Sequence, residues 1–277
     1  MKADFHVHTN ISDGSMNIDQ VISMAISNEV THMAITNHDT VKGLPEAILL
    51  GKKAGIKIIP GIEISAFDFE TGRKIHILGF NFKLEATNIK KICDPILERR
   101  HNNSLWQISE LQKNGYIFNV DNIHSRAKSS EVIYKQHIMA ELTEADYSSR
   151  AYSDLYQKLF KGDGICARDI EYVDATDAVR AIKEDGGIAI LAHPGQLDSY
   201  SSIDKLVTAG LDGIELYHED HGQEDHIKVM QYCRKNYLIT TGGSDFHGSY
   251  GSPVKIGQKT SAEEFIHVLD NGIIYKN

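Results

Sequence analysis

The stretch Ala3-Asp4-Phe5-His6-Val7-His8 has the pattern of a short buried strand that ends in two histidines. Residues i and i+2 of a strand point to the same face, so His6 and His8 would project together from its end. Alone, a His-x-His pair is weak evidence for a metal site, because a single histidine near a strand end is more often a hydrogen-bonded structural residue. The meaning of the pair therefore depends on the rest of the chain.

Six further short runs, dense in Ile, Val, Leu and Ala, have the same strand character. Helix-like stretches separate several of them, and this alternation is typical of a parallel sheet covered by helices. Seven strands of this kind favour a distorted (β/α)7 barrel, of the α/β class, over an open sheet. The predicted strands are Ala3–His8, His32–Thr36, Lys57–Ile64, Lys74–Phe80, Gly187–Ala192, Gly213–Tyr217 and Leu238–Thr241.

The alternation breaks between about residues 83 and 180. Ile89, Ile92 and Ile96 recur there at helical spacing, and Asn114-Gly115 is a signal for the end of a helix. We therefore predict an inserted helical domain at 83–180, between a first barrel part at 1–82 and a second at 181–277. The insertion holds 14 of the 29 Lys and Arg residues of the chain, counted from the sequence.

Composition narrows the classes of function. The formal net charge of −9 disfavours a broad surface for long duplex nucleic acid, although a metal cluster can still attract a small anion. Three scattered cysteines predict neither disulfides nor a cysteine zinc site, and they fit a reducing cytoplasm. No signal peptide or membrane-spanning apolar run is expected, since the N-terminus leads directly into the first strand.

Further ionisable residues lie at or near the other strand ends. Because the strand ends of a parallel barrel meet at one rim, these residues should converge in space. A buried polar cluster without a metal would be costly, and imidazole with carboxylate suits manganese, iron or zinc. The sequence therefore predicts a metal centre. The additional candidates are His38, Glu63, His76, His193, Asp245 and His247.

Several motifs, in this order along the chain, resemble the polymerase and histidinol phosphatase (PHP) domain family. This resemblance implies a distorted seven-stranded β/α barrel with up to three divalent metals. The motifs are Asp-Phe-His-Val-His-Thr with Ser-Asp-Gly, Thr-Asn-His-Asp-Thr, Pro-Gly-Ile-Glu, His-Ile-Leu-Gly, Ala-His-Pro and Gly-Gly-Ser-Asp-Phe-His-Gly.

The resemblance also assigns ligands and catalytic residues. It implies that His6, His8, Glu63 and Asp245 bind one metal. Glu63 would bridge to a second metal held by His76 and His193, and Asp13, His38 and His247 would bind a third. Glu63, Asp245 and His193 are the expected catalytic residues. Asn37 replaces the family's usual aspartate; we expect it to lie behind the ligands, where the change would weaken metal affinity without removing a ligand.

The insertion suggests a subgroup of the family. Its arrangement resembles stand-alone phosphoesterases that act on small nucleotides, including nucleoside 3',5'-bisphosphate phosphatases, which commonly show Gly-Arg-Pro-His-Ile-Ala. Here the stretch is Tyr134-Lys135-Gln136-His137-Ile138-Met139, and lysine lacks the bidentate fork of arginine. The predicted substrate-binding residues are Lys135, His137, Arg99, Arg100 and His221.

The predicted activity is hydrolysis of a small phosphorylated substrate by a hydroxide that bridges two metals. A nucleotide is the favoured substrate, either a nucleoside 3',5'-bisphosphate or a short oligonucleotide. Histidinol-phosphate phosphatase and cyclic-phosphate phosphodiesterase are rival enzyme activities with the same metal chemistry. A metal-binding regulatory domain without activity is the rival that is not an enzyme.

Overall fold

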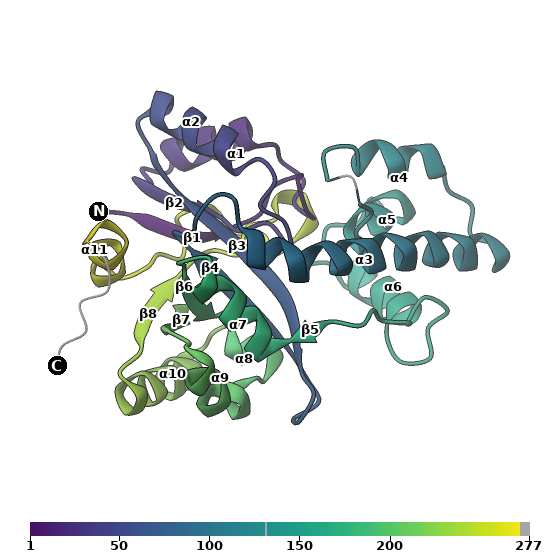
Figure 1. Cartoon of the computed structure of the whole chain (residues 1–277). Coiled ribbons are helices and arrows are strands. Elements are labelled where there is room, and N and C mark those ends of the chain that lie inside the picture. The colour runs from purple at the N-terminus through teal and green to yellow at the C-terminus, as the bar shows by residue number, and fades with distance from the viewer. Residues whose placement is uncertain (131, 272–277) are drawn as a thin grey trace.

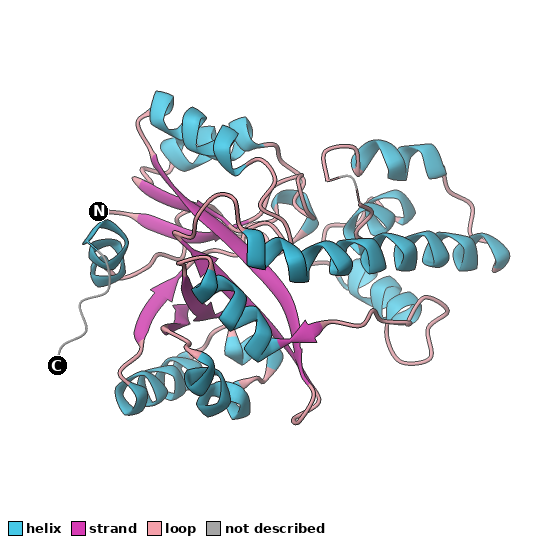
Figure 2. Ribbon diagram, in the orientation of Figure 1, coloured by secondary structure: helices cyan, strands magenta, loops and turns pink. Residues whose placement is uncertain are grey.

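The computed structural model describes residues 1–130 and 132–271 of the 277-residue chain. Its centre is one strongly curved sheet in the order β1-β2-β3-β4-β6-β7-β8 (Figures 1 and 2). The loop after β8 joins the last strand to the first, because the His8 amide donates to the Phe246 carbonyl. The strands are β1 Ala3–Val7, β2 His32–Ile35, β3 Lys57–Asp68, β4 Arg73–Phe80, β6 Ile188–Leu191, β7 Gly213–Tyr217 and β8 Ile239–Gly242. The predicted barrel-like α/β fold is confirmed.

The prediction that all strands are parallel is wrong for β4. This strand pairs antiparallel with both β3 and β6, and only a turn ending at Gly72 separates it from β3. A four-residue connection cannot hold a crossover helix, so the chain has to reverse direction here. His76 therefore does not end a strand at the rim. It pairs with Ser65, two residues beyond Glu63, and thus lies at the same level of the barrel.

Alternate side chains of the strands fill the interior of the barrel. Phe5, Leu78 and Phe80 are fully buried there, and the Phe5 and Phe80 rings lie 6.1 Å apart. Helix α11 (Glu263–Asn271) adds Phe265, whose ring meets Phe5 edge-on at 5.3 Å. In Figure 1 this helix lies beside the N-terminus, so it covers the end of the barrel where the parallel strands begin. The candidate metal ligands lie at the opposite end, where the parallel strands finish.

Helices cover the outside of the sheet in two groups (Figures 1 and 2). Their apolar faces, with the outward side chains of the strands, make the largest core of the molecule, which includes Val21, Ala47, Ile182 and Val229. None of the helices in the described part of the chain is long and apolar enough to cross a membrane. The helices are α1 Ile18–Ser27 and α2 Leu44–Ala54 on one side, and α7 Ala175–Glu184, α9 Ile203–Ala209 and α10 Gln223–Asn236 on the other, with the short α8 Pro194–Leu197 beside β4.

The segment between β4 and α7 forms the lobe at the right of Figure 1. It contains α3 Thr87–Lys113, α4 Val120–Arg126, α5 Lys135–Leu142 and α6 Arg150–Phe160. The predicted helix end at Asn114-Gly115 is confirmed, because Asn114 caps α3 and Gly115 has a φ of 79°. A two-residue strand, β5 (Val173–Asp174), then pairs with β3 and returns the chain to the barrel.

In a fully parallel barrel, an insertion after the fourth strand would leave at the rim that carries the candidate ligands, but this one does not. Because β4 runs backwards, it ends at the opposite end, and α3 must travel the length of the barrel. At about 1.5 Å per residue its 27 residues span about 40 Å. The first half packs on the barrel core through Ile89 and Cys93, whereas Ile108 and Leu111 belong to a separate apolar cluster of the lobe.

The domain boundaries at 82/83 and 180/181 stay a prediction. The lobe's own apolar cluster is consistent with a separate unit, but α7 packs with the barrel although most of it precedes residue 181. The predicted second barrel part also includes residues 272–277, which lie outside the described residues.

Truncating the core of the lobe should destabilise it. Leu111 is fully buried in that cluster, so Leu111→Ala should cost about 2–5 kcal/mol of unfolding free energy. Trp106, the single tryptophan, lies on the same helix and reports unfolding by its fluorescence in a urea titration. Leu105→Ala is the control, because Leu105 is 39% exposed and should change stability by no more than about 0.5 kcal/mol. Equal effects of the two variants would contradict this packing.

Candidate metal centre and substrate pocket

Four residues from β1, β3 and the loop after β8 point their ligand atoms at one place. Nε2 of His6 lies 3.2 Å from Oε2 of Glu63 and 3.3 Å from Oδ1 of Asp245. Nε2 of His8 lies 3.1 Å and 3.3 Å from the same two oxygens. Ligand atoms about 2.1 Å from a shared ion, at tetrahedral or octahedral angles, lie about 3.0–3.4 Å from each other. The four atoms therefore have the spacing of a coordination shell.

The second oxygen of Glu63 faces a different pair of histidines. Oε1 lies 2.8 Å from Nδ1 of His76 and 2.9 Å from Nε2 of His193. The reversed direction of β4 makes this possible, since it places His76 beside β3 rather than at a distant strand end. Each oxygen of one buried carboxylate thus serves a separate cluster of imidazoles, as a bridging ligand does.

A third group lies next to the first. Oδ1 of Asp13 is 3.4 Å from Nε2 of His247, and Oδ2 is 3.8 Å from Nε2 of His38. With His8, these residues can place one ligand atom each within 4.8 Å of one another. Asp13 lies in the Ser-Asp-Gly loop after β1. This loop is compact, because a Cβ on Gly14 would lie 2.9 Å from the His8 carbonyl carbon.

Many of these buried atoms have no hydrogen-bond partner within the described structure. Leaving so many polar atoms unsatisfied would be costly unless they bind something else. Nitrogen and carboxylate donors that point at common centres are suited to divalent metal ions. The residues present therefore fit such ions. The unpartnered atoms include His6 Nε2, both ring nitrogens of His8, Asp13 Oδ1, His38 Nδ1, His193 Nδ1 and Asp245 Oδ1.

The backbone is strained at the same place. Asp39, His193 and Asp245 have φ values of 58°, 22° and 52°, in the left-handed region that residues with a Cβ rarely adopt. Gly243 approaches β1 so closely that a Cβ there would lie 2.3 Å from the Cβ of His6. The Gly-Gly-Ser-Asp turn therefore needs glycine at this position to bring Asp245 to the two histidines.

Charges within the cluster stabilise one another. Burial raises the pKa of the Glu63 carboxyl, but His38, His6 and His76 outweigh it, so its pKa lies well below the usual range. Burial lowers the pKa of His6, but Glu215, Asp245 and Glu63 raise it well above the usual value. Protons and metal ions therefore compete for the same imidazole nitrogens, which makes metal binding dependent on pH.

Glu215 of β7 is a candidate functional residue that the sequence reasoning missed. It is fully buried; Oε1 lies 3.1 Å from Nδ1 of His6, and Oε2 accepts a hydrogen bond from the His193 amide. A carboxylate on Nδ1 leaves Nε2 of His6 free for a metal and fixes the ring. Its signal was a charged residue inside an otherwise apolar strand. His218, just after β7, also faces the cluster, since its Nε2 lies 3.3 Å from Oδ2 of Asp245.

Asn37 lies behind the ligands. Its side-chain oxygen accepts hydrogen bonds from the amide and hydroxyl of Thr9 and from the hydroxyl of Ser12. These are bonds that an aspartate oxygen could also accept. Asparagine at this position therefore still holds the loop that carries Asp13.

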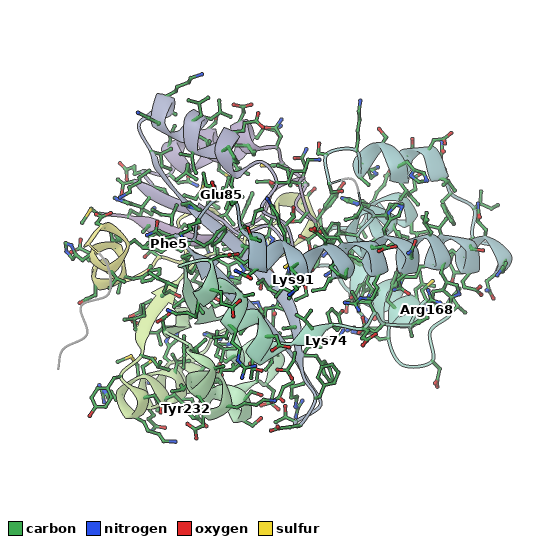
Figure 3. The ribbon with its side chains drawn as sticks, viewed as in Figure 1. Phe5, Lys74, Glu85, Lys91, Arg168 and Tyr232 are labelled. Atoms are coloured by element: carbon green, nitrogen blue, oxygen red, sulfur yellow. The ribbon has the colours of Figure 1, made fainter. Side chains whose placement is uncertain are left out.

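A pocket of about 500 Å3 lies over the cluster, between the barrel and the lobe. Its floor is formed by candidate ligands such as Glu63 and His193, and Arg100 and Lys135 line its walls. Lys74 of β4 also lines it and points toward the lobe (Figure 3), where its ammonium pairs with Asp169. The tyrosines and one lysine that the sequence reasoning missed are Tyr134, Tyr147, Tyr152, Tyr156, Tyr172 and Lys161.

Three of the predicted substrate-binding residues do not line this pocket. Both ring nitrogens of His221 are bonded to backbone, at Leu216 and Gly195. His137 is fully buried, and its Nδ1 accepts a hydrogen bond from the Tyr134 amide. Arg99 lies 3.7 Å from Glu171 at the surface. Arg100 does line the pocket, but its Nη2 already donates to Asp39 and Ser65.

Comparison with known proteins shows where this arrangement recurs. Residues 4–185 match the model of the PHP domain. The chain is 48% identical over 262 residues to a phosphoribosyl 1,2-cyclic phosphate 1,2-diphosphodiesterase of Eggerthella lenta, covering 95% of this chain and 100% of that protein. This chain belongs to the PHP family. It is a metal-dependent phosphoesterase, as the motifs predict.

More distant relatives agree on the fold. A 3',5'-nucleoside bisphosphate phosphatase of Chromobacterium violaceum is 27% identical, with 88% of this chain and 86% of that protein covered. A solved structure from Bifidobacterium adolescentis superposes with a TM-score of 0.88 at 24% identity, covering 99% of this chain and 97% of that one. The solved structure therefore has the same fold as this chain along almost its whole length.

Replacing Glu215 by glutamine should weaken metal binding. Two donors face its carboxylate, the Nδ1 of His6 and the amide of His193, and glutamine offers only one acceptor oxygen to them. We expect an affinity about 10- to 100-fold lower in a competition titration of metal against a chromophoric chelator. Glu219→Gln, which changes a half-buried carboxylate 3.8 Å from Lys259, is the control. Unchanged affinity in Glu215→Gln would show that the bond to His6 does not matter.

Proposed function

We propose that this enzyme hydrolyses the cyclic phosphate of a phosphoribosyl 1,2-cyclic phosphate. The supporting observation is the 48% identity to the Eggerthella lenta enzyme of that name, along the whole length of that protein. Opening the ring consumes one water, breaks one P–O bond and leaves a phosphate monoester. Attack of a second water on that monoester would release inorganic phosphate. The cyclic-phosphate activity, at first a rival to the nucleotide prediction, thus becomes the preferred one.

For the metals we keep the assignment that the motifs implied. His6, His8, Glu63 and Asp245 would hold one ion, and Glu63, His76 and His193 a second. Asp13, His38 and His247 would hold a third, in each case manganese, iron or zinc. The spacing of 3.1–3.3 Å among the first four ligand atoms and the two-sided contacts of Glu63 support this assignment. Bound there, the ions would supply a Lewis acid and an activated water.

The residues of the lobe would bind the part of the substrate that does not react. Such a substrate carries a phosphate outside the cyclic ester. Lys135 and Lys161 line the pocket above the ligands, as does Arg100, whose guanidinium is held by Asp39. An anion bound to these cations would place the cyclic ester over Glu63.

A nucleoside 3',5'-bisphosphate is the second candidate substrate. Tyr147, Tyr152 and Tyr156 line the pocket together, and Tyr152 and Tyr156 are stacked with centroids 6.4 Å apart. Aromatic faces of this kind can stack on a nucleobase. This observation, together with the 27% identical bisphosphate phosphatase, supports the nucleotide prediction made from the sequence.

A direct comparison of substrates should separate the two. We expect phosphoribosyl 1,2-cyclic phosphate to have a kcat/KM at least 10-fold above that of adenosine 3',5'-bisphosphate, both followed by phosphorus NMR with added manganese. Glu63→Gln is the control for chemistry at the metal cluster, and it should lose at least 100-fold on either substrate. The opposite preference would establish the nucleotide activity and refute the cyclic one.

The charge of Lys135 should appear in the pH dependence of binding. Burial, with Lys74, Lys161 and Arg100, lowers the pKa of Lys135 to about 8 although Asp169 raises it. The positive charge is present below that pH and lost above it, so KM for phosphoribosyl 1,2-cyclic phosphate should rise as the pH passes 8. A charge-assisted contact of about 1.5–3 kcal/mol predicts a rise of roughly 10- to 100-fold.

The matched variant is Lys135→Arg, which stays charged at every pH of interest. Its KM should remain flat between pH 7 and 9, whereas Lys135→Ala should show the high value throughout. Ribose 1,2-cyclic phosphate lacks the outer phosphate, so its KM should be the same for the wild type, Lys135→Arg and Lys135→Ala. The same pH-dependent rise in Lys135→Arg as in the wild type would assign the titration to another group.

A further inference from the structure

Residues at the start of helix α5 of the lobe contact two members of the third candidate metal group, His38 and Asp13. The hydroxyl of Tyr134 donates a hydrogen bond of 3.0 Å to the backbone carbonyl of His38. Two residues later, the side-chain amide of Gln136 donates a bond of 2.9 Å to Oδ2 of Asp13. Lys135, between them, lines the pocket. One turn of the inserted lobe therefore contacts two candidate ligands and the substrate cavity.

The bond from Gln136 makes the two oxygens of Asp13 different: one accepts a hydrogen bond and the other is left for an ion. Oδ2 is engaged by the amide, whereas Oδ1 has no hydrogen-bond partner in the described structure and lies 3.4 Å from Nε2 of His247. A carboxylate held in this way is oriented to offer one oxygen to an ion. The Asp13 side chain is almost completely buried, so few groups other than Gln136 and the neighbouring histidines can reach its oxygens.

Apart from the contacts of Asp13 with His8, His38 and His247, the other described supports of this loop do not involve its carboxylate. Asn37 holds Thr9 and Ser12, and the amide of Gly14 donates to the Thr9 carbonyl. These bonds help to position the Cα of Asp13 but do not orient its carboxylate. Gln136 is thus the described residue that fixes the direction of the carboxylate by a neutral hydrogen bond.

We propose that Gln136 is a positioning residue for the third metal centre, through which the inserted lobe controls how tightly that centre binds its ion. This inference rests on the proposed function, because it takes Asp13, His38 and His247 to be the ligands. A positioned outer partner of a metal ligand typically contributes 10- to 100-fold in metal affinity. Because Lys135 adjoins Gln136, any movement of α5 on substrate binding would also reach Asp13.

The test is a manganese titration of metal-free protein, followed by electron paramagnetic resonance of the free ion. Gln136→Leu removes the donor at similar volume and should weaken the last ion to bind by 10- to 100-fold while leaving the tighter ions unchanged. Gln136→Glu places a second carboxylate against Asp13 and should weaken it further. Activity of Gln136→Leu should recover at high manganese, whereas that of Lys135→Ala should not.

Gln196→Leu is the matched control, because it deletes another amide-to-carboxylate bond, from Gln196 to Asp220, at the edge of the same pocket. Its manganese affinities should equal those of the wild type. Circular dichroism of the metal-free variants checks that each is folded, and Gln136→Glu remains informative if Gln136→Leu is not. Unchanged affinity for the last ion in the folded Gln136 variants would overturn the role of Gln136. A wild type that binds two ions, with Asp13→Ala no different, would instead overturn the third centre.

Discussion

The buried carboxylate of Glu63 is the constraint on which the rest of the site depends. One oxygen faces His6 and His8, and the other faces His76 and His193, so residues from four strands must arrive at one point. A negative charge in this position would be prohibitively costly without cations around it. His6 can supply one of them, because Glu215, Asp245 and Glu63 raise its pKa well above the usual value although burial lowers it. Bound metal ions would supply the rest of the positive charge. The centre is therefore a network in which no member can be changed alone.

The reversed strand β4 follows from the same requirement. In a fully parallel barrel, every strand runs toward the same rim and carries its ligand at its carboxyl end. Here β3 continues past the rim to Asp68, turns, and returns as β4, which brings His76 down to the level of Glu63. The return has a structural consequence. After β4 the chain lies at the end of the barrel opposite the candidate ligands. The long helix α3 then returns it to the pocket.

The sequence predicts the barrel and the polar cluster at its rim because both depend on local patterns. Apolar runs mark the strands, and ionisable residues at their ends mark the cluster. The direction of β4 was missed because an apolar run has no direction, although Thr71-Gly72 offered a turn signal. Glu215 was missed because its partners lie far away in sequence, at His6 and His193. The pocket walls were only partly predicted, since the placement of α5 and α6 depends on tertiary packing.

Besides the apolar packing of Ile89 and Cys93, polar contacts connect the lobe to the barrel. Arg100 of α3 reaches Asp39 and Ser65 at the rim, and its guanidinium lies 5.0 Å from the centre of the Tyr134 ring. Tyr134 in turn bonds to the backbone of His38. Such directional contacts fix orientation, whereas apolar contacts would fix only proximity. An enzyme that must place a substrate phosphorus atom over a metal cluster needs orientation. The lobe therefore forms one wall of the pocket over the candidate ligands, even though its apolar cluster is separate from that of the barrel.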